Sequence, residues 1–185
     1  MPVFEDQELV LRARQGSGIA AGELYERYHQ QIFRYAFYRT GNQGVAEDIT
    51  SEVFLKMVQK ISDFQTKNGN FQGWLFRIAH NSIIDYYRKT QVHPEVPINE
   101  DLTRDTESVL SEVSKSMTEE TLLQGLQKIN EDQRSVIILR FIGGLPIAQV
   151  AGTLNKSEDA VKGLQRRGLL ALREVLDRWE VSYDA

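Results

Sequence analysis

The chain has 185 residues, no cysteine, 22 basic against 26 acidic side chains, and 41% hydrophobic residues. This composition is typical of a globular protein and excludes a collagen, a disulfide scaffold and wholesale disorder. The acidic start, MPVFEDQELV, lacks the basic and apolar regions of a signal peptide. No apolar run approaches the roughly 20 residues of a membrane span. We therefore expect a cytoplasmic protein without membrane insertion.

The net charge of −4 is unevenly distributed along the chain. Residues 1–91 carry +1, residues 92–120 carry −6, and residues 121–185 carry +1. The middle segment also holds two of the four prolines and shows no sustained helical or strand periodicity, which is typical of a linker. The sequence therefore predicts two domains, 1–91 and 121–185, joined by a flexible acidic linker over 92–120.

Helical periodicity dominates the first domain and predicts an all-α fold. After a short helix near 5–15, we expect helices over 22–39 and 45–61, with the first of these ending at Gly41-Asn42. The apolar residues that recur every three or four positions are Leu24, Tyr28, Ile32 and Tyr35 in one helix, and Ile49, Val53, Met57 and Ile61 in the next.

A further helix over 71–90 carries a polar stripe. Arg77, Asn81 and Arg88 fall on one face, with aromatic side chains including Tyr86 around them, and an Asn- and Gly-rich loop precedes the helix. A basic stripe with aromatic neighbours is the kind of surface that holds single-stranded nucleic acid. Alone the pattern is weak, because aromatic clusters at helical spacing belong more often to a core.

The second domain contains a sharper pattern. Two short apolar helices, 121–129 and 131–142, precede a third that Pro146 starts. Asn155 suits a left-handed turn position, and Ser157 suits the N-cap of a long final helix. Together these features predict a helix-turn-helix, whose second helix enters the DNA major groove. The polar side chains on its N-terminal half are Lys162, Gln165, Arg166 and Arg167. The alternative is a solvated amphipathic helix.

Two motif blocks resemble a known family. AEDITSEVFLKM (46–57), followed by FQGWLFRIAHNSIIDYYRK (71–89), is similar to region two of the extracytoplasmic-function (ECF) sigma factors of the sigma-70 family. Residues 126–176 are similar to region four of the same family. The resemblance implies a sigma factor that recruits core RNA polymerase to promoters, aids promoter opening, and has no cofactor, metal or catalytic chemistry of its own.

The resemblance also implies site residues. Asp48 and Glu52, with Phe54 and Leu55 as apolar anchors, match the surface that docks on the polymerase clamp helices. Region four implies contact with the polymerase flap and with the −35 element, through Lys162, Gln165, Arg166 and Arg167. An anti-sigma protein is a further implied partner. The implied −10 contacts are the base-capturing loop with Asn68 and Asn70, and the helix side chains Arg77, Asn81, Tyr86 and Arg88.

The family's path for the linker leads toward the RNA exit channel. We therefore expect the −6 segment to occupy a channel built for polyanions.

Three positions depart from the family pattern. Ser51 replaces a Gln of the clamp-binding helix, and Ala160 replaces a frequent Thr. Gly163-Leu164 replaces a Ser-Arg pair in the recognition helix and places a glycine inside a helix, at a cost of about 1 kcal/mol relative to Ala. We therefore expect an altered −35 preference, or a weaker region-four grip with more reliance on the −10 contacts.

Two other classes of protein compete with this interpretation. One is a helix-turn-helix regulator whose N-terminal bundle senses a ligand and never engages polymerase. The acids exposed in the 46–57 block have no role in such a sensor. The other is a helical-bundle metalloenzyme, but none of His29, His80 and His93 stands in a metal-binding motif, and the spacing of Glu26 and His29 favours a solvated pair.

Overall fold

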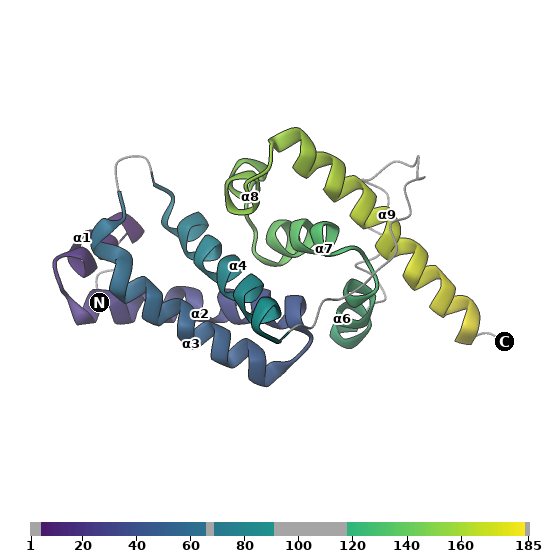
Figure 1. Cartoon of the computed structure of the whole chain (residues 1–185), viewed down its shortest axis with the longest axis horizontal. Coiled ribbons are helices and arrows are strands. Elements are labelled where there is room, and N and C mark those ends of the chain that lie inside the picture. The colour runs from purple at the N-terminus through teal and green to yellow at the C-terminus, as the bar shows by residue number, and fades with distance from the viewer. Residues whose placement is uncertain (1–4, 66–68, 91–117, 184–185) are drawn as a thin grey trace.

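The structure is a computed structural model that describes residues 5–65, 69–90 and 118–183, and all regular elements in these ranges are helical. The N-terminal half contains α1 (Asp6–Arg14), α2 (Gly18–Thr40), α3 (Gln43–Lys60), the 3₁₀ turn η1 (Ile61–Asp63) and α4 (Phe71–Thr90) (Figure 1). The C-terminal half contains α6 (Glu119–Gln127), α7 (Glu131–Ile137), the π-helical turn η2 (Ile138–Ile142), α8 (Ile147–Leu154) and α9 (Glu158–Tyr183). The all-α prediction is confirmed.

Local sequence explains where the N-terminal helices begin and end. The Ser17 side chain accepts a hydrogen bond from the Ala20 N–H at 3.3 Å, so α2 starts four residues before the predicted position. Gly41 ends α2 with a φ of 67°, as predicted, because a left-handed residue is tolerated best by glycine. Asn42 then caps α3 through a 3.0 Å bond from the Val45 N–H.

The predicted apolar stripes form the core of this half. α2 packs along α3, and both contact α4. All eight side chains predicted for the two stripes are buried: Leu24, Tyr28, Ile32, Tyr35, Ile49, Val53, Met57 and Ile61. Burial of one such side chain contributes about 1.5–3 kcal/mol relative to leaving it exposed, so these stripes hold the helices in place.

The helix-turn-helix is confirmed in the C-terminal half. α8 and α9 are joined through Asn155, whose φ of 53° and ψ of 46° are left-handed. The Ser157 hydroxyl oxygen accepts a hydrogen bond from the Ala160 N–H at 3.1 Å, which caps α9. Ala151 and Val161 are both buried where the two helices meet. Pro146 differs from expectation in one detail, because it is the N-cap residue of α8 and not its first helical residue.

The two halves pack against each other. α4 contacts α8, and α2 contacts both η2 and α6 (Figure 1). The contact between halves is polar in part: the Tyr38 hydroxyl donates to Glu119 at 2.9 Å, and the Gln127 amide donates to the Tyr38 carbonyl at 2.9 Å.

The predicted linker ends earlier than composition indicates. Glu119 and Glu120 belong to the predicted linker, but they form the first turn of α6, which Thr118 caps. Residues 91–117, which include the rest of that acidic segment and His93, lie outside the described residues.

Candidate DNA and polymerase interfaces

The N-terminal half of α9 presents an exposed basic face. Lys162, Arg166 and Arg167 are all exposed there, and Lys162 forms a surface ion pair with Asp159 at 3.3 Å. Exposed ion pairs contribute little free energy, so this lysine can exchange its partner for a phosphate with small cost. Arg and Lys at these positions suit guanine edges and phosphates respectively.

Gln165 is less exposed than these three cations. It is half-buried, and its Oε1 accepts a hydrogen bond from Arg140 Nε at 3.1 Å. Arg140 also donates to the Leu145 carbonyl at 2.6 Å, which fixes the guanidinium under the recognition helix. The amide oxygen of Gln165 is therefore already engaged in a hydrogen bond within the protein.

Gly163 makes room for a neighbouring cation. A Cβ added at Gly163 would lie 3.3 Å from Arg167 Nη1, which is tighter than an ordinary contact. The glycine that departs from the family pattern thus lets the Arg167 guanidinium fold close to the helix backbone. The glycine costs the helix about 1 kcal/mol and leaves open the space beside which the Arg167 guanidinium lies.

The predicted stripe on α4 is exposed. Arg77, Asn81 and Arg88 all face solvent, and Arg88 is 3.6 Å from Asp85 in a surface ion pair. Tyr86 is half-buried, and its ring lies 5.5 Å from that of Tyr87. Arg77, Asn81 and Arg88 therefore share one surface, whereas Tyr86 lies on the side of α4 that faces α3, where it lines a small recess with Asp48 and Glu52.

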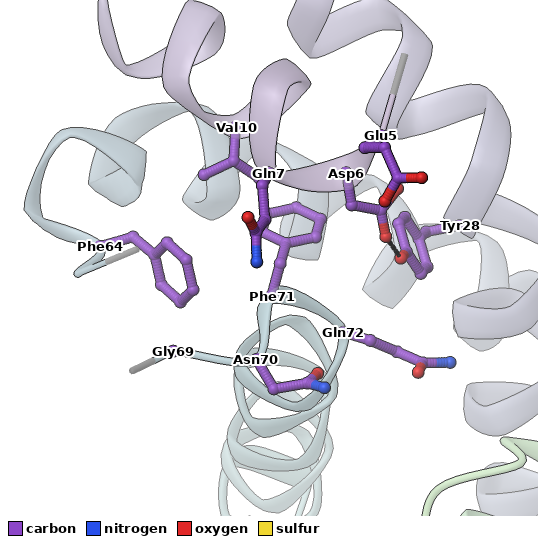
Figure 2. A pocket seen from close by; sticks show the side chains of 10 residues that line it. All are labelled: Glu5, Asp6, Gln7, Val10, Tyr28, Phe64, Gly69, Asn70, Phe71 and Gln72. Carbon is purple, nitrogen blue, oxygen red and sulfur yellow. Dashed lines mark hydrogen bonds between the residues drawn. The ribbon is translucent and has the colours of Figure 1, made fainter. Parts of the chain in front are cut away.

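A cavity of about 260 Å³ lies where the loop before α4 meets α1 (Figure 2). Its wall includes the Phe64 and Phe71 rings and the amides of Gln7, Asn70 and Gln72. Asn70 caps α4, because its Oδ1 accepts from the Gly73 N–H at 2.8 Å. Asn68, the other predicted residue of this loop, lies outside the described residues.

One carboxylate orders the rim of this cavity. Asp6 accepts a hydrogen bond from the Tyr28 hydroxyl, which Figure 2 shows, and another from Arg27 at 2.6 Å. Burial, followed by the hydrogen bond to Asp6, raises the pKa of Tyr28 well above its ordinary value. Tyr28 therefore remains a neutral donor at physiological pH, and α1 is tied to α2 beside the cavity.

The outer face of α3 combines acids with apolar side chains. Asp48 is exposed, Glu52 is half-exposed and paired with Lys56, and Leu55 is 60% exposed. Val58, which the sequence reasoning missed, is 56% exposed on the same face. The sequence could have predicted that Val58 is exposed, because it stands three residues after Leu55 and off the buried stripe. We call Asp48, Glu52, Leu55 and Val58 the α3 patch.

The expectation for Phe54 was wrong. Its side chain is only 6% exposed, and its ring packs edge-on against Tyr25 with ring centroids 4.8 Å apart. Phe54 lies off the Ile49–Val53–Met57 stripe, and for that reason the sequence predicted that it lies outside the core. In the structure, α2 covers that side of α3 as well. Phe54 supports the patch from beneath and is not an exposed anchor.

The two histidines that the structure describes each contact a tyrosine. His29 stacks on Tyr25, and His80 Nδ1 is 3.1 Å from the Tyr35 hydroxyl. Burial, and then the positive charge of Arg39, lowers the pKa of His80 to about 4. No group of three or more His, Cys, Asp or Glu side chains with metal-site geometry occurs within the described ranges.

These features define a helical DNA-binding protein of two packed units, one of which is a helix-turn-helix. Within the part of the chain that the structure describes, no helix combines the length and the apolarity needed to cross a membrane.

Residues 24–92 match the family described as Sigma-70 region 2, and residues 125–174 match the family described as Sigma-70, region 4. The chain is 35% identical over 171 residues to the ECF RNA polymerase sigma factor BldN of Streptomyces coelicolor, a match that covers 91% of this chain and 65% of that protein. It is 32% identical over 163 residues to the ECF RNA polymerase sigma factor SigX of Bacillus subtilis, covering 83% of this chain and 82% of SigX.

Solved structures agree with the fold. CnrH, in complex with the cytosolic domain of CnrY, matches with a TM-score of 0.72 at 25% identity, covering 94% of this chain and 97% of CnrH. The sigma factor RpoE of Bartonella quintana, in complex with the anti-sigma factor NepR, shares the fold with a TM-score of 0.65 at 20% identity, covering 84% of this chain and 96% of RpoE. The chain belongs to the ECF sigma factors of the sigma-70 family, which are transcription initiation factors. This membership favours the sigma-factor interpretation over the sensor-type regulator.

Proposed function

We propose that this sigma factor acts in the cytoplasm by docking core RNA polymerase on α3, reading the −35 element with α9, and opening the −10 element with α4 and its preceding loop. The chain contributes binding and no catalytic chemistry of its own. The observation that carries this proposal is the separation of chemistries on one chain. α9 and α4 expose cations, whereas α3 exposes acids beside Leu55 and Val58.

The α9 contact supplies duplex recognition. Lys162, Arg166 and Arg167 occupy the part of a recognition helix that faces base edges and phosphates in the major groove. Gln165 offers only its amide N–H groups, since its oxygen is engaged by Arg140. Such a side chain suits an acceptor, such as guanine O6 and N7 or thymine O4, better than the bidentate pairing with adenine.

The α4 surface and the cavity beside it supply single-strand capture. Extruding a base from the stack costs a few kcal/mol, which a fitted pocket and stacking offset. The 260 Å³ cavity lies directly before α4, and Arg77, Asn81 and Arg88 continue from it along the helix. A base held in the cavity leaves the adjoining backbone beside these side chains.

The α3 patch supplies the protein contact. Interfaces need apolar anchors that lose water and charges that steer the encounter, and the patch provides both kinds. A smaller cavity of about 190 Å³ opens beside it between α3 and α4, and its charged lining residues are Asp48, Glu52, Asp85 and Lys89. Acids outnumber the one lysine in this recess, so it fits a basic side chain of the polymerase. The structural relatives bound to CnrY and NepR further support a partner of the anti-sigma class.

Footprinting with reconstituted holoenzyme tests this division of labour. Core polymerase plus the protein should protect two promoter blocks about 25 base pairs apart and make bases in the downstream block reactive to permanganate. The protein alone should protect neither block at the same concentration. A stable footprint without core polymerase, or a single block with it, would contradict the proposal.

A further inference from the structure

One wall of the 260 Å³ cavity comes from α1, a helix that the family comparison does not reach. The match to Sigma-70 region 2 begins at residue 24, whereas α1 ends at Arg14. α1 nevertheless lines the cavity with Gln7 and with Glu5, its N-cap residue. The chemistry of this wall therefore has to be derived from the side chains of α1 themselves.

α1 is fixed in its place beside the cavity. Val10, on its inner face, is buried. At the other end of the helix, Arg14 Nη2 donates a 3.2 Å hydrogen bond to the Ser62 carbonyl, two residues before Phe64 of the cavity wall. The bonds that Asp6 accepts tie the same helix to α2. The wall that α1 provides is thus formed before any ligand arrives.

The opposite wall is aromatic and suits a planar ligand. The Phe64 and Phe71 rings are both buried, with their centroids 5.9 Å apart. A Cβ added at Gly69 would lie 2.7 Å from Phe64 Cζ, so the loop runs this close to the ring only because the residue is glycine. Sites for drug-sized ligands enclose about 300–1,000 Å³. The smaller volume and the aromatic wall fit a single planar group, such as one nucleobase.

Most polar atoms in the cavity wall already have partners within the protein. Asp6 is engaged in its two bonds with α2. Asn70 Oδ1 caps α4, and Gln72 Nε2 donates to Gln31 Oε1 at 3.0 Å. These groups are committed to holding the fold, so the reading of a ligand falls to the remaining polar side chains.

Those remaining side chains are the two from α1. Among the described residues, neither the Gln7 amide nor the Glu5 carboxylate has a hydrogen-bond or ion-pair partner, and Glu5 does not cap its own helix. Figure 2 shows the Gln7 side chain extending from α1 toward Phe64 and Phe71. A carboxylate only accepts hydrogen bonds, whereas an amide both accepts and donates. The α1 wall therefore requires a donor on the ligand.

We propose that Glu5 and Gln7 make this cavity select a base with an exocyclic amino group, namely adenine, cytosine or guanine, over thymine. The inference rests on the proposed function, because it takes the captured base as the occupant of the cavity. A flipped base is read along its Watson–Crick edge. The amino group donates to the Glu5 carboxylate, and the Gln7 amide bonds the neighbouring atom of that edge. Thymine would place a carbonyl oxygen against the carboxylate, leaving two acceptors facing each other.

Base analogues in fork-junction DNA test this selection. The probe carries the −35 element as duplex and the non-template strand of the downstream block as single strand, from a promoter that the holoenzyme protects. An abasic site is moved through that strand, and the position where it weakens holoenzyme binding most identifies the captured base. At this position cytosine is compared with uracil, which has a carbonyl in place of the amine, and adenine with purine, which lacks the amine. The amino-bearing base of each pair should bind about tenfold more tightly.

Two variants of α1 should relax the preference in different ways. Glu5→Gln should improve binding of uracil, because an amide can turn its nitrogen toward a carbonyl. Gln7→Ala should weaken binding of cytosine and adenine several-fold. Both variants should bind the abasic probe as the wild type does, which shows that the fold is intact. Glu8→Gln is the matched control, because Glu8 pairs with Arg12 on the same helix and does not line the cavity.

The outcomes separate this proposal from the one on which it rests. Equal or tighter binding of uracil and purine by the wild type, an unchanged preference in both α1 variants, or an equal loss of preference in Glu8→Gln would overturn the role of α1. If an abasic site weakens binding at no position, no base is captured, and the single-strand capture in the proposed function is contradicted instead.

Discussion

Arg140 Nε donates a 3.1 Å hydrogen bond to Gln165 Oε1, and this bond determines which half of the Gln165 amide is offered to DNA. An arginine has donors only, so the amide oxygen must face it and the amide nitrogen must face away. Arg140 itself is fixed by the Leu145 carbonyl and lies over the Phe141 ring, with its guanidinium carbon 5.7 Å from the ring centroid. The π-helical turn that contains Arg140 thus supports the recognition helix from behind.

The first prediction concerns base preference at the position that Gln165 faces. Arg140→Ala should release the amide oxygen and shift preference toward adenine, by about 1–3 kcal/mol for a gained bidentate pair. The measurement is holoenzyme binding to a complete set of single-base substitutions in the −35 element. Gln165→Ala is the companion variant, and an unchanged preference in both variants would show that Gln165 reads no base.

The second prediction concerns the exposed cations of α9. Arg166→Ala and Arg167→Ala should each weaken holoenzyme binding by about 1–3 kcal/mol where the side chain reads a base, and lower the salt dependence by about one charge where it binds phosphate. Arg178→Ala is the matched control, since Arg178 is an exposed arginine on the C-terminal half of the same helix. Equal losses from Arg178→Ala would place the DNA contact elsewhere on α9.

The third prediction concerns the α3 patch. Leu55→Asp should weaken binding to core polymerase by at least about 2 kcal/mol, because it puts a charge at a site that becomes desolvated. Ile19→Asp makes the same chemical change at an apolar side chain that is 80% exposed on α2, outside the patch. Competition for core polymerase against a labelled sigma factor measures both. Indistinguishable binding of the two variants would remove α3 from the interface.

The fourth prediction concerns pH. Burial and Arg39 lower the pKa of His80 to about 4, below its ordinary value near 6.5, so below pH 6.5 the unfolded chain takes up a proton that the folded chain does not. The contribution of His80 to the free energy of unfolding should therefore be fully present above pH 6.5. It should be lost as the pH falls from 6.5 to 4, and the loss should be at most about 3 kcal/mol.

Denaturant titrations across this pH range measure the effect. His80→Gln should flatten the profile, whereas His29→Gln should retain it, because His29 stacks on Tyr25 at the surface and not between the halves. Parallel profiles for wild type and His80→Gln would contradict the assignment.

The fifth prediction concerns the turn of the helix-turn-helix. Asn155 has a φ of 53°, so Asn155→Ala should destabilise the protein by about 1 kcal/mol, whereas Asn155→Gly should be close to neutral. Thermal unfolding of the two variants gives the comparison. Equal stability of the alanine and glycine variants would mean that the turn relaxes to another backbone conformation.

Local patterns predicted most of the helices, and the remaining differences have one physical origin. Periodicity and capping depend on residues within a turn or two, so Gly41, Asn155 and Ser157 were assigned correctly. Arg39 looks like an ordinary cation in the last turn of a helix, but it is buried against Glu131 and Ser135 of α7, which begins 92 residues further along the chain.

The same reason accounts for what the sequence did not show within the candidate sites. Phe54 is covered by Tyr25 of α2. The Gln165 assignment stays a prediction, but the orientation of its amide depends on Arg140 of the π-helical turn in the same way. Neither partner is visible in the periodicity of the helix concerned. The −10 assignments of Asn70, Arg77, Asn81, Tyr86 and Arg88 stay predictions, as do those on α9.

Start-site mapping tests the central claim most directly. Core polymerase with and without the protein is used to transcribe a library of genomic fragments, and the 5′ ends that depend on the protein are aligned. We predict start sites that require the protein and share two upstream sequence blocks about 25 base pairs apart, with Arg166→Ala relaxing the upstream block alone. The absence of any start site that depends on the protein would contradict the account.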